Sequence, residues 1–342
     1  MGDILHAMPA VTALRQSHPE WFLGWAVEPR WEPLFRDAGG GMPLIDRMHL
    51  ANAKAWARSP VSRQTFHEIG ELRRELHAER YDVCVDLQGA VRSALLARAA
   101  GAPRIVGEAR PREPLARWLF HERIPTRGTH VIEQAIEVCN AITGDRLQPT
   151  LSVLPADPEA EAWAESLLQI GNFGEAAGPV VLLSPGAGWG AKRWPPERYG
   201  QLAAKLDAAG CRVLVNAGPD ERAIADTVLA AARAASAAEQ LGVKAPEFSL
   251  SRLIAVTRRS SLVIAGDTGP LHLACALGKP VVGIFGPTEP KRNGPFGVPS
   301  RVLRHPESRR DHTRRAAPEA GLLTIAPDQV FAAAMELLQR GA

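Results

Sequence analysis

One stretch of the sequence, GDTGPLHLACALGK (266–279), gathers polar side chains directly after an apolar run. Its candidate ligand-binding residues are Asp267, Thr268, Gly269 and His272. A proline follows Gly269 and suits the first turn of a helix, so a helix is expected to begin here. Such a helix start presents unpaired N–H groups and a partial positive charge, which favour the binding of phosphate oxygens. The alternative is that Asp267 and Thr268 serve only as caps of this helix.

A second turn, SPGAGWGAKRWPPERY (184–199), also follows an apolar run. Its glycines let the backbone approach a ligand closely, and Lys192 adds a compact positive charge. Two such turns, each beyond the carboxyl end of a strand in the same lobe, predict a diphosphate site. Ser184 and Gly186 belong to this predicted site.

A third polar turn, NAGPDERAIA (216–225), places Asp220 and Glu221 at the start of a helix. Either these carboxylates only stabilise the helix dipole, or Glu221 accepts hydrogen bonds from ribose hydroxyl groups. None of the glycine turns has the G-x-G-x-x-G spacing of a dinucleotide site or the G-x-x-x-x-G-K-[ST] spacing of a P-loop. The sequence therefore disfavours nicotinamide and P-loop chemistry.

The chain opens with GDILHAMPAVTALRQSHP (2–19), in which apolar residues recur at helical spacing behind Asp3. Asp3 is either the cap of this helix or a general base, because a carboxylate above a sheet edge can reach an incoming hydroxyl group.

Short apolar runs bounded by turn residues alternate with helical stretches, which is typical of an α/β protein with parallel sheets. The expected strands lie within 81–89, 102–108, 178–186, 211–218, 261–269 and 279–286. The expected helices lie within 66–79, 157–169, 196–209, 221–240 and 327–340. We expect two Rossmann-like lobes, 1–168 and 180–326, joined by a linker at 169–179 and facing a central cleft. The final helix, 327–340, is expected to pack back on the first lobe.

The composition of the chain argues against several classes of protein. The 342 residues carry a formal net charge of +3, which suits an anionic small molecule or membrane surface but falls short of a nucleic-acid-binding stripe. The four cysteines are scattered and have no metal-ligand spacing, so we expect reduced thiols and no metal site. No apolar run is long enough to span a bilayer, and no signal sequence is recognisable, so a cytoplasmic protein is expected.

Several stretches in collinear order resemble the family 9 glycosyltransferases, the ADP-heptose:lipopolysaccharide heptosyltransferases, and most of all heptosyltransferase I. They are MGDILHAMPAVTALRQ, YDVCVDLQGAVRSALLARAAGAPRIVG, RPREPLARWLF, THVIEQ, SPGAGWGAKRWPPERY and GDTGPLHLACALGKPVVGIFGPTEPKRNGPFG. Because they extend over nearly the whole chain, they are more specific than any single turn.

The resemblance implies a GT-B fold with an N-terminal acceptor lobe and a C-terminal donor lobe. It implies inverting, metal-independent transfer without a cofactor, with ADP-L-glycero-D-manno-heptose as the donor substrate. Asp3 would be the catalytic base, and Lys192 would neutralise the donor diphosphate. The phosphates and the sugar would be held by Asp267, Thr268, Gly269 and His272, while Glu221 would contact the nucleoside.

The sequence departs from the family at its beginning. Family members normally have a first strand and a Ser-rich turn before the Gly-Asp pair, whereas this chain starts within that turn. We therefore expect an N-terminal lobe that lacks its first strand, with two unpaired sheet edges, and we expect Met1 to be an internal methionine of a longer reading frame.

The acceptor implied by the resemblance is the anionic Kdo-lipid A core of lipopolysaccharide. Basic residues of the first lobe that could read its carboxylates and phosphates are Lys54, Arg58, Arg63, Arg92 and Arg112. Each could instead belong to a solvated helix face, and Trp56 could be either a membrane or acceptor contact or a packed aromatic. We expect a monomer bound peripherally to the cytoplasmic face of the inner membrane, with no nucleic-acid partner.

Three alternatives stay open at this point. The enzyme could be another family 9 transferase, such as a heptosyltransferase II. It could be an epimerase of UDP-sugars with the same two-lobed fold, or a non-catalytic binder of nucleotide sugars.

Overall fold

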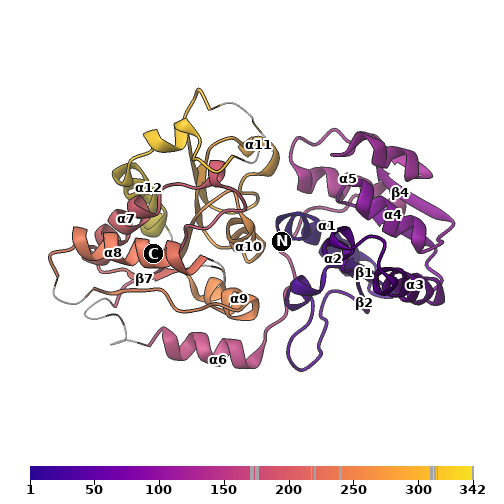
Figure 1. Ribbon diagram of the computed structural model, residues 1–342, viewed down its shortest axis with the longest axis horizontal. Helices are drawn as coiled ribbons and strands as arrows, with labels where there is room; N and C mark the ends of the chain where they lie inside the picture. The colour runs from indigo at the N-terminus through magenta and orange to yellow at the C-terminus, as the bar shows by residue number, and fades with distance from the viewer. Residues whose placement is uncertain are drawn as a thin grey trace. The chain divides into compact units, whose positions relative to one another are not determined.

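The computed structural model divides the chain into two compact units, which we call unit 1 (Asp3–Pro155) and unit 2 (Ala156–Ala342) (Figure 1). It describes all residues except 170–172, 174–176, 217, 219–220, 239–240, 309–310, 312, 314 and 341–342. Part of the predicted linker, 169–179, therefore lies outside the described residues.

Unit 2 is built on a parallel sheet of six strands in the order β11-β10-β9-β6-β7-β8. The strands are β6 (Val180–Ser184), β7 (Arg212–Val215), β8 (Val243–Lys244), β9 (Leu262–Gly266), β10 (Val281–Phe285) and β11 (Ser300–Arg304). Every residue of β6, β9 and β10 is buried, as a parallel sheet covered on both faces requires. The four predicted strands of this lobe are thus confirmed.

Helices cover both faces of this sheet (Figure 1). They are α6 (Pro158–Leu167), α7 (Pro196–Ala208), α8 (Arg222–Ala235), α9 (Leu250–Arg259), α10 (Gly269–Ala276), α11 (Pro290–Asn293) and α12 (Pro327–Arg340), with short 3₁₀ turns at η3 (Gly190–Lys192) and η5 (Ala320–Thr324). Residues of α7, α8 and α12 share one hydrophobic core with the strands, and α10 contacts α9. The two groups therefore form the two outer layers of unit 2.

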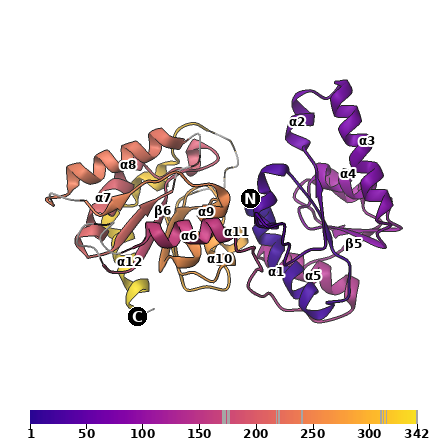
Figure 2. The same ribbon diagram turned by 90° about the horizontal axis from the view of Figure 1, so that it is seen from below.

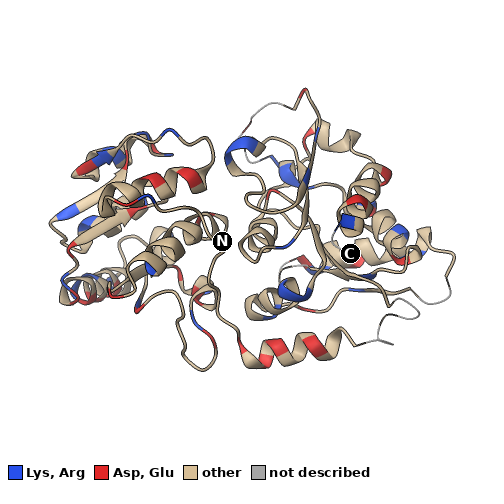
Figure 3. Cartoon of the chain, turned by 180° about the vertical axis from the view of Figure 1, so that it is seen from behind, with Lys and Arg blue, Asp and Glu red and all other residues tan. Residues whose placement is uncertain are grey.

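Two helices that the sequence assigned to the first lobe belong to unit 2 instead. α6 packs on α9, where Glu161 forms ion pairs with both Arg258 and Arg259. Figure 3 shows several acidic residues along α6, the lowest helix in that view. The final helix, α12, packs on α7, β9, β10 and β11 and buries Val330 in the core of unit 2. The division of the chain thus falls at Pro155, ahead of the predicted linker.

Unit 1 contains two separate parallel sheets, one of β1 and β2 and one in the order β3-β4-β5. The strands are β1 (Gly24–Val27), β2 (Arg47–Leu50), β3 (Val83–Asp86), β4 (Arg104–Glu108) and β5 (Glu122–Ile124). Around them lie α1 (Gly2–Ser17), η1 (Pro29–Leu34), α2 (Ala53–Arg58), α3 (Arg63–Ala78), α4 (Val91–Ala99), η2 (Pro114–Leu119) and α5 (Val131–Thr143).

The edges of β1 and β3 are unpaired on one side. Within residues 1–155, all of which the structure describes, each of these strands pairs with a single neighbour. Gly24 and Ala26 of β1 are exposed, and 36% of Val85 in β3 is exposed, whereas strands inside a parallel sheet are normally covered. The predicted pair of open edges in the first lobe is thus present.

Two further observations concern the described residues alone. None of their helices combines the length and apolar character needed to cross a membrane. The four cysteines, Cys84, Cys139, Cys211 and Cys275, are free thiols.

Candidate active site

The buried polar cluster of unit 2 joins Lys192, Asp267 and His272. Lys192 Nζ lies 2.6 Å from Asp267 Oδ2 and donates a second hydrogen bond to the Asp267 carbonyl oxygen at 3.3 Å. His272 Nε2 lies 3.1 Å from the other carboxylate oxygen, Oδ1. The side chains of Lys192, Asp267 and His272 are only 13%, 5% and 6% exposed, respectively.

Neighbouring strands bring this cluster together. Asp267 directly follows β9, His272 lies in the first turns of α10, and Lys192 ends η3 in the turn beyond β6. Because β6 pairs with β9 in parallel, the turns at their carboxyl ends meet at the same edge of the sheet. The two turns that the sequence predicted as one site are therefore in direct contact.

The carboxylate of Asp267 is held in its charged form. Burial acts to raise the pKa of Asp267. The hydrogen bond and charge of His272 and the ammonium of Lys192 lower it by more, so the net pKa lies well below the ordinary value. Asp267 therefore stays ionised and orients both of its partners.

Capping of α10 does not account for Asp267 or Thr268. Thr268 is the N-cap residue, but no side chain hydrogen bond caps the helix, and the Thr268 hydroxyl instead donates to the Gly266 carbonyl at 3.3 Å. Gly269 is the first residue of the helix. The first N–H groups of α10 therefore donate no hydrogen bond to the N-cap side chain.

The turn beyond β6 carries a second cation next to Lys192. Arg193 has no ion pair among the described residues; its Nη2 donates to the Ala187 carbonyl at 3.5 Å, and its buried Nε has no hydrogen-bond partner there. Lys192 Nζ also lies 4.4 Å from the centroid of the Trp189 ring. Asp267 forms its ion pair with Lys192, so the Arg193 guanidinium keeps its charge without a carboxylate partner among the described residues.

Glu221 reaches across from the third predicted turn. Its carboxylate accepts a hydrogen bond from the Gly218 N–H at 3.1 Å and lies directly against Gly186, where an added Cβ would be 2.1 Å from Oε2. Glu221 is the N-cap residue of α8 but makes no capping hydrogen bond with its side chain. Asp220, which the sequence placed beside it, lies outside the described residues.

Ser184 lies at the end of β6 and makes a hydrogen bond to the neighbouring turn. It ends β6, is 1% exposed, and its hydroxyl oxygen accepts a hydrogen bond from Asn216 Nδ2 at 3.3 Å. This hydrogen bond therefore connects the turn beyond β6 with the turn beyond β7.

In unit 1, the carboxylate of Asp3 is bound by two side chains. Asp3 Oδ2 accepts hydrogen bonds from Gln88 Nε2 at 2.8 Å and from Arg112 Nη1 at 3.0 Å. Asp3 lies in the first turn of α1 but is not its cap, since Met1 occupies that position. About half of its side chain, 49%, is exposed.

The surroundings set the charge of Asp3. Burial acts to raise its pKa, whereas the positive charge of Arg112 and the hydrogen bonds from Gln88 and Arg112 lower it, and the net pKa lies below the ordinary value. Asp3 is therefore held as a carboxylate by Arg112 and Gln88.

Asp86 organises the loop that carries Gln88. The buried carboxylate of Asp86 accepts hydrogen bonds from the N–H groups of Gln88 and Gly89 and from the Ser93 hydroxyl. Burial raises the pKa of Asp86 above its ordinary value, although these hydrogen bonds oppose the rise. Sequence reasoning missed Asp86 and Gln88, although both stand at the carboxyl end of the predicted strand 81–89.

The sequence model of glycosyltransferase family 9 (heptosyltransferase) matches residues 69–322, more than half of the chain. This chain belongs to glycosyltransferase family 9. It is 29% identical to lipopolysaccharide heptosyltransferase 1 of Escherichia coli K12 over 318 residues, 90% of this chain and 91% of that protein. It is 27% identical to lipopolysaccharide heptosyltransferase 2 of Salmonella typhimurium over 315 residues, 89% of this chain and 85% of that protein.

The fold agrees with this family. The structure of E. coli heptosyltransferase WaaC with ADP matches with a TM-score of 0.74 at 24% identity, covering 100% of this chain and 97% of that one. The expected GT-B fold of two Rossmann-like units is thus confirmed, and so is the expected glycosyltransferase.

The basic residues that the sequence assigned to the family 9 acceptor fall into two groups. Arg112 pairs with Asp3, and Arg92 lies 3.6 Å from Glu28, so both contact carboxylates of unit 1. Lys54 and Arg58 are exposed on α2 and Arg63 is exposed at the start of α3, and no described residue forms an ion pair with them.

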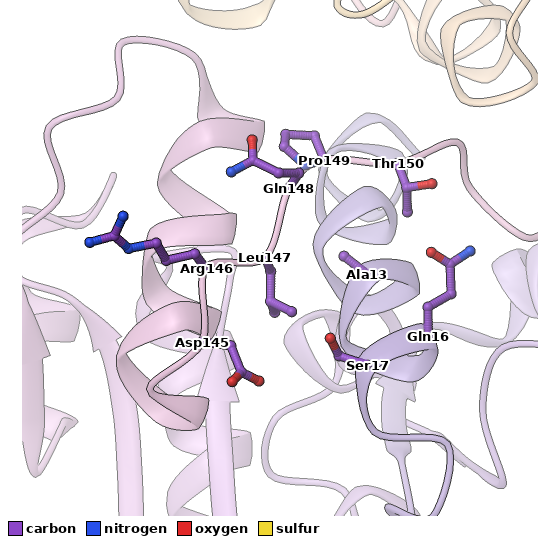
Figure 4. A pocket seen from close by; sticks show the side chains of 9 residues that line it. All are labelled: Ala13, Gln16, Ser17, Asp145, Arg146, Leu147, Gln148, Pro149 and Thr150. Carbon is purple, nitrogen blue, oxygen red and sulfur yellow. The ribbon is translucent and has the colours of Figure 1, made fainter.

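One open pocket of unit 1, of about 620 Å³, lies between the end of α1 and the segment that follows α5 (Figure 4). It is lined by Ala13, Gln16, Ser17, Asp145, Arg146, Leu147, Gln148, Pro149 and Thr150. None of the predicted site residues lines it.

Proposed function

We propose that this protein transfers heptose from ADP-L-glycero-D-manno-heptose to the Kdo-lipid A inner core of lipopolysaccharide, with inversion and without a metal ion. The observation that carries the proposal is the buried cluster of Lys192, Asp267 and His272 in a chain of family 9. Its similarity to lipopolysaccharide heptosyltransferase 1 over 90% of the chain supports this choice of donor and acceptor.

The donor diphosphate would bind at the first turn of α10 and the turn beyond β6. Lys192 and Arg193 supply positive charge there, and the N–H groups at the start of α10 add hydrogen-bond donors. As the bond between the anomeric carbon and the diphosphate breaks, negative charge grows on the leaving oxygen, and these groups stabilise it. Asp267 keeps Lys192 and His272 in place, and Glu221 would contact the ribose.

Asp3 would remove the proton of the attacking acceptor hydroxyl. The lowered pKa of Asp3 keeps it ionised, and because about half of its side chain is exposed, a substrate can reach it. Arg112 opposes protonation of Asp3, so an acceptor anion that binds Arg112 would release Asp3 to act as the base. Lys54, Arg58, Arg63 and Arg92 would contact further acidic groups of the acceptor, at the cytoplasmic face of the inner membrane.

A second candidate within the family is transfer to an acceptor that already carries one heptose. It is favoured by the 27% identity to a lipopolysaccharide heptosyltransferase 2 over 89% of the chain.

The experiment is incubation of the protein with ADP-heptose and either Kdo-lipid A or its singly heptosylated form, followed by mass spectrometry of the lipid. We expect a gain of one heptose on Kdo-lipid A, which EDTA leaves unchanged. A gain only on the heptosylated lipid would favour the second candidate. Turnover of a UDP-sugar donor without any acceptor would instead indicate an epimerase, and binding without turnover a nucleotide-sugar binder.

A further inference from the structure

Exposed large apolar side chains gather on unit 1. Among the described residues, ten of them lie in unit 1 and two, Val302 and Leu323, in unit 2. Three of the ten, Val61, Phe66 and Ile69, lie at the turn between α2 and α3 and along α3, and are 84%, 63% and 41% exposed. This turn projects from the body of unit 1 (Figure 2).

The two flanks of α3 differ in character. At about 100° per residue, the buried positions Thr65, Leu72 and Leu76 form one face. One neighbouring flank carries Ile69, Arg73, Phe66, Gly70 and Arg63, without an acidic residue. The opposite flank carries Glu68, Glu75, Gln64 and Glu71. The helix therefore presents an apolar and basic flank on one side of its buried face and an acidic flank on the other.

The acidic flank is already occupied by contacts within unit 1. Glu68 accepts hydrogen bonds from Trp56 Nε1 at 2.7 Å and Gln64 at 2.9 Å, and Glu75 pairs with Arg47 at 3.1 Å. Trp56 is thus a packed aromatic, as one of its two sequence interpretations held.

The cations of the other flank, Arg63 and Arg73, and those of α2, Lys54 and Arg58, lack such partners among the described residues. No described residue forms an ion pair with Lys54, Arg58, Arg63 or Arg73, and all four side chains are exposed. A surface that combines projecting apolar side chains with unpaired cations fits an anionic bilayer, because the apolar tips enter the headgroup region while the cations stay beside lipid phosphates.

We propose that the turn between α2 and α3, together with the apolar and basic flank of α3, docks this protein on an anionic lipid bilayer. Val61 and Phe66 enter the interface and Arg73 lies next to lipid phosphates, while Lys54, Arg58 and Arg63 contact the acidic groups of the acceptor lipid in the same bilayer. The inference deepens the proposed function, because it places the unit that offers Asp3 at the membrane that would hold the lipid acceptor.

A second exposed surface of unit 1 is less suited to this role. Trp118 of η2, which is 64% exposed, already has two guanidinium groups over its ring, those of Arg117 at 4.7 Å and Arg123 at 5.1 Å. With Leu115, which is 70% exposed, it provides the rival surface against which the proposal is tested.

The test is sedimentation of the full chain with vesicles of phosphatidylcholine, with and without phosphatidylglycerol. We expect binding to the anionic vesicles that weakens with added salt. The double variant Val61→Ser, Phe66→Ser should bind about tenfold or more weakly. Arg73→Gln should bind about fivefold more weakly to anionic vesicles only. The control Leu151→Ser, Leu323→Ser changes two apolar side chains outside this surface that are 57% and 45% exposed, and it should bind like the unchanged chain.

Three results would overturn the proposal: no binding of the unchanged chain to anionic vesicles, undiminished binding of V61S/F66S, or a loss of binding in Leu115→Ser, Trp118→Ser instead. Thermal unfolding of each variant checks its fold. Heptose transfer to a water-soluble acceptor without acyl chains should be unchanged in V61S/F66S. Failure of the unchanged chain to transfer heptose to any acceptor would refute the proposed function, while vesicle binding would still report on the docking surface by itself.

Discussion

Asp3 is the residue on which the proposed chemistry depends most directly. Replacing it with alanine removes the base, so we expect Asp3→Ala to lower the transfer rate about 10²–10⁴-fold. ADP affinity should not change, because the cluster of Lys192, Asp267 and His272 belongs to unit 2. Calorimetric titration with ADP and a transfer assay measure the two effects, and full transfer by the variant would remove Asp3 from this role.

Arg112 sets the pH at which Asp3 can act. Because Arg112 lowers the pKa of Asp3 while burial raises it, the variant Arg112→Gln should raise that pKa. Asp3 is active when deprotonated, so the acid limb of the pH profile of kcat should move to higher pH. A profile with its acid limb at an unchanged pH would show that Asp3 does not control the rate.

Asp267 is expected to matter for stability as well as for binding. Removing its charge leaves Lys192 buried without its counterion, so Asp267→Asn should cost about 3–5 kcal/mol of unfolding free energy at neutral pH. The folded-state pKa of Asp267 is lowered, so this stability is present above the ordinary pKa and is lost as the pH falls toward the folded value. Asp328→Asn is the matched control, since Asp328 pairs with Lys205 at 2.7 Å on the surface and should cost at most about 1 kcal/mol.

At the scale of elements, a substitution in the turn beyond β6 tests whether Glu221 contacts the nucleoside. A methyl group at Gly186 would lie 2.1 Å from Glu221 Oε2, so Gly186→Ala must displace that carboxylate. We expect weaker binding of ADP with little loss of ribose-free pyrophosphate binding. Gly188→Ala is the control, because nothing lies within 4 Å of an added Cβ there, and equal effects of both variants would argue against a nucleoside contact.

The sequence predicts the buried strands of this protein better than its edge strands. β6, β9 and β10 are apolar throughout and fully buried, so their pattern is plain. β11 (Ser300–Arg304) and β1 (Gly24–Val27) lie at sheet edges and are partly exposed, so the pattern of a fully buried strand did not reveal them.

The candidate site shows a similar limit. Lys192, Asp267 and His272 were recognisable from their turns, but their mutual hydrogen bonds depend on the pairing of β6 with β9. Arg112 was assigned to the acceptor, whereas its contact with Asp3 joins residues 109 positions apart, a separation that no short motif reports.

At the scale of the whole molecule, the two units should differ in stability. Unit 2 has one six-stranded sheet with a continuous core, whereas unit 1 divides its strands between sheets of two and three. We expect calorimetry to resolve two unfolding transitions, the lower from unit 1. ADP should raise only the transition of unit 2, by mass action. A single transition that ADP shifts as a whole would contradict this.

The open edges of β1 and β3 have a consequence for handling the protein in solution. Each edge leaves backbone N–H and C=O groups without a strand partner, and such groups can pair with the same edge of another copy. Concentrated samples should therefore form oligomers rich in intermolecular β-structure, beginning from unit 1, and light scattering should rise steeply with protein concentration. Charged substitutions at the exposed positions Ala26 and Val85 should delay that rise.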